Sequence, residues 1–104
     1  MKQMETTHII FRQFKTGGKE IIALFPYEPY NQFDVNSINS YMHVGQHGEA
    51  NYEEVMKITS PCKNESDFDS LYNELVSIGY EDINILEKRN YNFALKNLKE
   101  NFAY

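Results

Sequence analysis

Residues 43–48 carry the most distinctive chemistry of the sequence, His-Val-Gly-Gln-His-Gly, in which two imidazoles flank a glycine. Imidazole binds transition metals and transfers protons near neutral pH, and glycine lets a backbone or a ligand approach closely. On an extended strand, however, His43 and His47 would lie about 13 Å apart at Cα, too far to share one ion unless Gly45 forms a bulge. We therefore expect no metal and no cofactor, and interpret the segment as a sheet-surface histidine with glycines that form a turn.

Cys62, the only cysteine, offers a second chemistry. A thiol becomes nucleophilic when an imidazole or a helix N-terminus stabilises its thiolate, and Cys62 comes just before a predicted helix. No third residue at a recognisable spacing completes such a site, so the alternative is a partly buried thiol in the loop that leads into the helix. A lone cysteine excludes an internal disulfide and is typical of a reducing compartment, and we expect a cytoplasmic protein.

Aromatic side chains are numerous, with eight Tyr and seven Phe. Three of them lie with two prolines in residues 25–30, where a strand is expected to leave the sheet. Phe25 suits a core, whereas Tyr27 and Tyr30 suit an interface if they are exposed, because tyrosines often anchor protein partners. We assign no catalytic residue. The candidate binding residues are Tyr27, Tyr30, Tyr41, His43, Gln46 and His47.

The net charge is −5, and residues 64–87 hold seven acidic side chains and no basic one. Such a surface repels phosphate, which disfavours direct nucleic-acid binding. The same stretch fits either a solvated helix face or a surface that docks on a basic partner. The longest apolar run, residues 21–27, falls well below the ~18 residues of a membrane span, so we expect no membrane partner.

The elements that position these residues begin with a hairpin, because residues 7–14 and 20–25 mix β-branched and aromatic side chains around a Gly-Gly turn. Pro26 and Pro29 are expected to end the second strand. A polar loop up to residue 39 then leads to a third strand over residues 40–46.

Two helices and a fourth strand follow. Residues 66–79 predict the main helix, with a capping-box-like start at Ser66 and Asp69 and with Gly79 as the left-handed residue after its end. Its apolar stripe is Phe68, Leu71, Tyr72, Leu75 and Ile78. Residues 82–86 predict the strand, with Ile83 and Ile85 on one face. Residues 91–104 predict a C-terminal helix whose apolar side chains are Phe93, Leu95, Leu98 and Phe102. Residues 51–57 fit a helical turn better than a strand.

These elements predict one α+β domain over residues 1–104, in which the 91–104 helix is a C-terminal extension. We expect a small mixed four-stranded sheet of order 3-2-1-4: a three-strand antiparallel meander, then a fourth strand that returns parallel to the first. The main helix covers one face. The third strand would be an uncharged edge, which predicts a homodimer or a complex with a protein partner.

Three anchors lie within residues 8–87: Ala-Leu-Phe-Pro at 23–26, Ser-Tyr-Met-His-Val-Gly-Gln-His at 40–47, and residues 71–80, which contain Glu74 and end in Gly79-Tyr80. In these anchors the chain resembles a family of short uncharacterised bacterial proteins, often carried on mobile elements. The resemblance implies a bacterial, cytoplasmic, single-domain protein and brings no activity. The 91–104 helix lies outside it.

The leading hypothesis for function is a non-enzymatic protein-binding or accessory module that engages its partner through aromatic side chains and residues 43–48. One alternative is a small enzyme or metal-dependent activity centred on His43 and His47, with Cys62 as an additional ligand or nucleophile. Another is an acidic inhibitor that blocks a nucleic-acid-binding protein.

Overall fold

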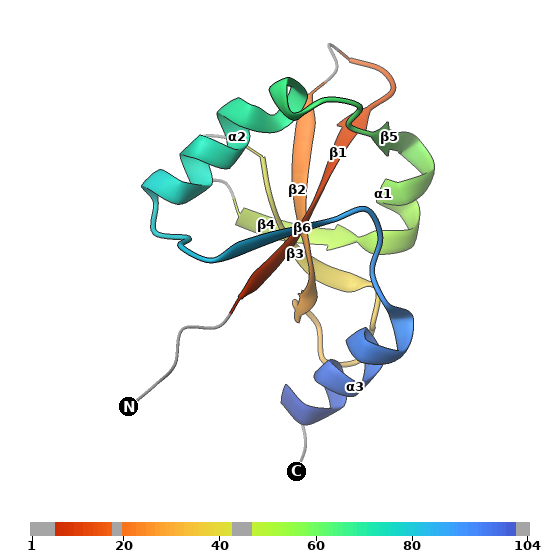
Figure 1. Ribbon diagram of the computed structural model, residues 1–104. Helices are drawn as coiled ribbons and strands as arrows, with labels where there is room; N and C mark the ends of the chain where they lie inside the picture. Colours follow the sequence, from red (N-terminus) through yellow and green to blue (C-terminus); the bar gives the residue numbers. More distant parts are fainter. Residues whose placement is uncertain (1–5, 18–19, 43–46, 102–104) are drawn as a thin grey trace.

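The computed structural model describes residues 6–17, 20–42 and 47–101, and within them the chain folds as an α+β domain with a six-stranded sheet and three helices (Figure 1). In chain order the elements are β1 (Thr7–Phe14), β2 (Ile21–Pro29), β3 (Ser37–Tyr41), β4 (His47–Asn51), α1 (Tyr52–Ile58), β5 (Thr59–Pro61), α2 (Glu65–Ser77), β6 (Ile83–Leu86) and α3 (Tyr91–Asn101).

The sheet runs in the order β4-β3-β2-β1-β5, and β6 also pairs with β1. The outer edge of β1 is divided between two strands: β5 pairs antiparallel with residues 12–14, and β6 pairs parallel with residues 7–10. The predicted parallel return of the last strand to β1 is therefore confirmed. The predicted four-strand order 3-2-1-4 is wrong, because β4 and β5 enlarge the sheet and β3 lies inside it rather than at its edge.

Both faces of β1 and β2 are buried, which explains why these strands read as apolar runs rather than as an alternating pattern. One face packs against α2 and the other against α1 (Figure 1). The core on the α2 face contains Ile9, Phe11, Ile21, Ala23, Phe25, Tyr41, Leu71 and Leu75. The core on the α1 face contains Ile10, Ile22, Leu24, Ile38, Tyr52 and Val55.

β2 continues through Pro26, so the prediction that this proline ends the strand is wrong, whereas Pro29 is the last residue of the strand, as expected. The register between β2 and β3 shifts between Phe25, opposite Asn39, and Pro29, opposite Ile38. Such an irregularity accommodates residues that lack an N–H donor without ending the pairing. β3 accordingly begins at Ser37, earlier than predicted. Residues 43–46 of the predicted third strand lie outside the described residues.

β4 occupies a stretch in which a glycine turn was expected, and Gly48 lies inside this strand. Its sequence, His-Gly-Glu-Ala-Asn, contains no β-branched or aromatic residue, so pairing with β3, not propensity, makes it a strand. The helix preferred for residues 51–57 is confirmed by α1, which buries Tyr52 and Val55 against the sheet.

α2 begins earlier than predicted, because its N-cap is Asn64 and not Ser66. The carboxylate of Asp67 accepts the backbone N–H groups of Lys63 and Asn64, both at 3.1 Å, which satisfies donors that the helix leaves unpaired. Gly79 has φ +122° just beyond the end of the helix, as expected for its role in termination. The helix ends at Ser77.

The apolar stripe of α2 is only partly as predicted. Leu71 and Leu75 are fully buried, and Phe68 and Tyr72 pack partly buried beside them. Ile78 is exposed, because the helix has ended before this residue. In β6, Ile83 packs on the α2-side core while Ile85 is exposed, which limits the predicted apolar face of this strand to one residue.

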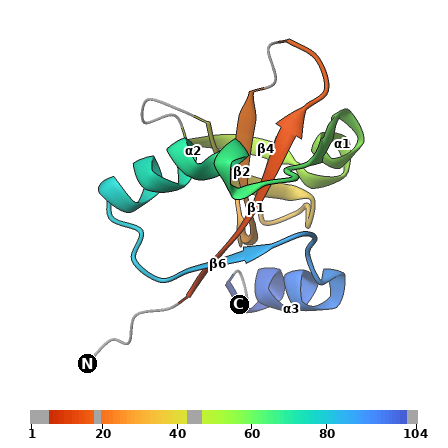
Figure 2. The same ribbon diagram turned by 45° about the horizontal axis from the view of Figure 1, so that its top comes forward.

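α3 lies at the end of the sheet where β2 ends, below β6 in Figure 2. Its buried residues are Ala94 and Leu98, which share a small enclosed space with Pro26, Pro29 and Ile38. The helix thus packs on the sheet through Leu98, as predicted, and through Ala94, which the predicted apolar face did not include. Leu95 is half-buried, Phe93 is exposed, and Phe102 lies outside the described residues.

We predict that Leu71→Ala or Leu75→Ala lowers the free energy of unfolding by about 2–5 kcal/mol, because each truncation leaves a cavity beneath α2. Urea denaturation followed by circular dichroism measures it. Val76→Ala, on the exposed side of the same helix, is the control and should change stability by no more than about 0.5 kcal/mol. Equal losses in all three variants would mean that α2 does not pack through this stripe.

Candidate functional site

The structure divides the predicted binding residues between two places. Tyr41 and His47 lie together where β3 and β4 meet, opposite each other in the strand register. Tyr27 and Tyr30 lie at the end of β2 that contacts α3. His43 and Gln46 lie outside the described residues. We define the first group, completed by Tyr80 and Glu74, as the histidine cluster.

Hydrogen bonds and ring contacts hold the histidine cluster together. The Nε2 atom of His47 lies 3.0 Å from the hydroxyl of Tyr80, and the hydroxyl of Tyr41 donates to the carboxylate of Glu74. The rings of Tyr41 and His47 meet edge to face at 4.7 Å between centroids, and Tyr80 stacks on Phe25 at 5.4 Å. The cluster therefore joins β2, β3, β4 and α2.

Burial raises the pKa of Tyr80, and the neighbouring Glu28 and Tyr41 raise it further. The phenol consequently stays protonated at neutral pH and serves as a hydrogen-bond partner of the imidazole rather than as a base. Tyr80 and Glu74 were not among the predicted site residues. No spacing in the sequence connects them to Tyr41 or His47, and only the fold brings these residues together.

Four large aromatic side chains are exposed in the described part of the chain, and they come from only two segments. Tyr30 and Phe33, 56% and 83% exposed, lie in the loop after β2, and Tyr91 and Phe93, 52% and 49% exposed, lie in the first turn of α3. These segments adjoin, since Pro29 and Val35 of the loop region line one small space with Ala94 and Leu98 of α3. We call these four residues the aromatic surface.

Tyr27 supports the aromatic surface and is itself partly buried. Its hydroxyl accepts the backbone N–H of Asn90 at 2.9 Å, and its carbonyl accepts a hydrogen bond from the side-chain amide of Asn97. Its ring meets Phe93 edge to face at 4.6 Å and His8 at 5.3 Å. Tyr27 thus fixes α3 against the sheet, a positioning role that differs from the predicted exposed anchor.

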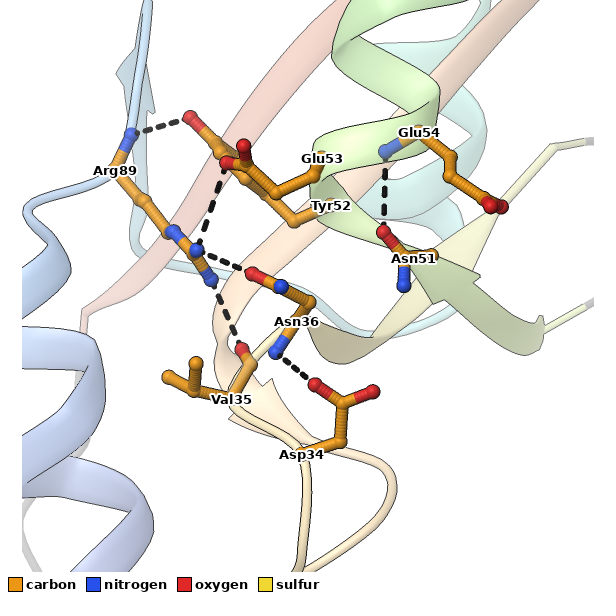
Figure 3. A network of polar contacts seen from close by, with 8 residues as sticks. All are labelled: Asp34, Val35, Asn36, Asn51, Tyr52, Glu53, Glu54 and Arg89. Atoms are coloured by element: carbon orange, nitrogen blue, oxygen red, sulfur yellow. Dashed lines mark hydrogen bonds and ion pairs between the residues drawn. The ribbon is translucent and has the colours of Figure 1, made fainter.

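Arg89 ties the start of α3 to α1 and to the loop before β3 (Figure 3). Its guanidinium donates to the carbonyl of Val35 at 2.9 Å and to the side-chain oxygen of Asn36, and it lies 4.1 Å from the centre of the Tyr52 ring. Its backbone N–H also donates to the Tyr52 hydroxyl at 3.0 Å. Glu53 is 3.8 Å away but mostly exposed. Nothing in the local sequence distinguishes this arginine from a surface cation.

Arg12 and Cys62 line a groove of about 250 Å³ beside the N-terminus of α2, where β5 and β6 both leave β1. The guanidinium of Arg12 is buried and donates to the hydroxyl and the carbonyl of Thr59, both at 2.9 Å, which ties β1 to β5. Burial raises the pKa of Cys62, and Asp67 raises it further. This thiol is thus kept protonated, which disfavours the nucleophile hypothesis.

Within residues 6–17, 20–42 and 47–101, no three side chains of His, Cys, Asp or Glu come together as a metal site requires, and no helix has the length and apolarity to cross a membrane. Comparison with protein-family models, with curated proteins and with solved structures gives no match.

We predict that Arg89→Met lowers the free energy of unfolding by about 1–3 kcal/mol, because the acceptors at Val35 and Asn36 lose their donor. Glu53→Gln should cost less than about 1 kcal/mol, since an exposed ion pair contributes little. Chemical denaturation of both variants provides the comparison. A larger loss for Glu53→Gln would show that charge pairing, not the neutral acceptors, holds Arg89.

Tyr80 should make the protein lose stability at alkaline pH. Since its folded-state pKa is raised above the ordinary value of 10.0, the contribution of the neutral phenol is complete below that pH and is lost as pH rises through the folded-state value. Tyr80→Phe keeps the ring on Phe25 but cannot ionise, so its unfolding free energy should fall less steeply at alkaline pH. Tyr91→Phe, with an exposed ring, is the control and should fall like the wild type.

Proposed function

We propose that this chain is a non-enzymatic protein-binding module, bacterial or mobile-element in origin and cytoplasmic, whose partner docks on the aromatic surface. The observation that supports this most directly is that Tyr30, Phe33, Tyr91 and Phe93, the exposed large aromatics of the described chain, all lie on two adjoining segments. Large aromatic side chains dominate binding energy at protein interfaces, whereas scattered exposed apolar residues carry no such meaning.

The support beneath the aromatic surface favours binding without large rearrangement. Arg89 fixes the loop before β3 through Val35 and Asn36, and Tyr27 fixes the start of α3 through Asn90. A surface held in place before binding loses less conformational entropy when a partner docks. These contacts join the loop and the helix to the core, so the aromatic side chains are presented by a rigid support.

A second candidate function is a small enzyme activity centred on His47. The observation in its favour is the 3.0 Å contact of its ring with the hydroxyl of Tyr80, which places an imidazole beside a protonated phenol. General acid–base catalysis needs such a pair within reach of a substrate. The third hypothesis, an acidic inhibitor, is weakened because Asp67, Glu74 and Asp82 accept hydrogen bonds from other residues of the fold.

The test is capture of partners from a bacterial lysate with the full chain as bait, followed by mass spectrometry. The double variant Phe33→Ser, Tyr91→Ser should lose the captured partner, since truncating an anchor typically weakens binding by roughly tenfold or more. The control Val76→Ser, Ile78→Ser removes exposed apolar side chains at the end of α2 and should retain it.

Circular dichroism establishes that both double variants are folded. Retention of the partner by Phe33→Ser, Tyr91→Ser would refute the aromatic surface as its binding site. Loss of the partner in His47→Ala, with both double variants unaffected, would indicate that the functional site is the histidine cluster.

A further inference from the structure

β4 is a free edge of the sheet, because it pairs with β3 on one side and with none of the described residues on the other. The other edge, along β1, is covered by β5 and β6. An uncovered edge presents backbone donors and acceptors that can pair with another chain. β4 is therefore the place where the sheet can be extended.

The hydrogen-bonding register decides which residues face outward. Tyr52, directly after β4, donates its N–H to the carbonyl of Asn36 on the β3 side at 2.8 Å. Because antiparallel pairs alternate between bonded and non-bonded, Ala50 and Gly48 also direct their backbone groups toward β3. The N–H and C=O groups of His47 and Glu49 consequently point away from the sheet, where an added strand would meet them.

The charge beside this edge is negative. Residues 47–54 contain Glu49, Glu53 and Glu54 and no Lys or Arg. Glu53 turns toward Arg89, which compensates it, whereas Glu54 points away from Arg89 (Figure 3). Glu49 is exposed and accepts a hydrogen bond from the hydroxyl of Ser37, a neutral donor that leaves its charge uncompensated.

The negative charge of Glu49 determines which kind of strand can extend the sheet. A second copy paired antiparallel over all five residues of β4 would place Glu49 opposite its own equivalent, and like charges directly opposite are destabilising. A strand with Lys or Arg on the same face would instead gain a cross-strand ion pair. On the opposite face Gly48 leaves room, since a Cβ atom at this position would meet nothing within 4 Å.

We propose that the outer edge of β4 binds an extended, cationic segment of a partner protein, which adds to the sheet as a further strand. The backbone groups of His47 and Glu49 supply the hydrogen bonds, and the carboxylate of Glu49 selects positively charged side chains. This edge involves none of the four residues of the aromatic surface, so either proposal can fail without the other.

The probes are two short synthetic peptides with blocked ends, one with Lys and one with Glu alternating with Val or Thr. An NMR titration of the full chain at low salt should shift the amide signals of His47 and Glu49 with the Lys peptide. The Glu peptide should bind roughly five- to tenfold more weakly. Glu49→Lys should remove or reverse this preference, and the charge-matched control Asp69→Lys on α2 should keep it.

A second variant tests the proposal in case Glu49→Lys does not fold. Glu49→Pro removes an outward N–H donor but leaves the β3-facing groups of Gly48 and Ala50, and it should abolish binding of the Lys peptide. The proposal is overturned if the Lys peptide does not bind, binds no better than the Glu peptide, or is weakened equally by Asp69→Lys. It is also overturned if the His47 and Glu49 amides are protected by self-association without peptide.

Discussion

Burial of β1 and β2 on both faces is the constraint on which the rest of this structure depends. Ile9 and Ile10, adjacent in the chain, are both fully buried, one beneath α2 and the other beneath α1. Two separate helices are needed to cover what one hairpin exposes, and the chain supplies them before and after β5. The histidine cluster, the aromatic surface and the outer edge of β4 therefore all lie at the periphery of this hairpin, either beyond its ends or on the strands added to its sides.

Polar contacts add to apolar packing in attaching the periphery to the hairpin. Arg12 joins β1 to β5, and Arg89 joins α3 to the loop before β3, in both cases largely through backbone carbonyls or neutral side-chain oxygens. A planar guanidinium with several donors suits this task, because it can satisfy acceptors from different segments at once. The two arginines thus fix the positions of elements that are too short to bury a core of their own.

The sequence predicted secondary structure best where the local pattern of apolar side chains was enough to specify an element. β1 was predicted from its β-branched and aromatic residues, such as Ile9 and Phe11, and α2 from the helical spacing of Leu71 and Leu75. β4 was missed because its residues have low strand propensity, so that only the neighbouring β3 makes it a strand. Arg89 was missed for a related reason: its acceptors are more than fifty residues away in sequence. Tyr41 and His47 were both among the predicted binding residues, but their contact with each other and with Tyr80 is apparent only in the fold.

The division of the outer edge of β1 has a consequence for synthesis on the ribosome. β5 follows β1 within about half the chain, but the partner of residues 7–10 is β6, made near the end. Until then the backbone of residues 7–10 has no neighbour on that side, although Ile9 and Ile10 are fully buried in the folded protein. Unpaired apolar edges are prone to pair with other chains. The nascent chain is thus exposed to misassembly at its first strand until its last strand is available, and chaperone binding during translation would protect this segment.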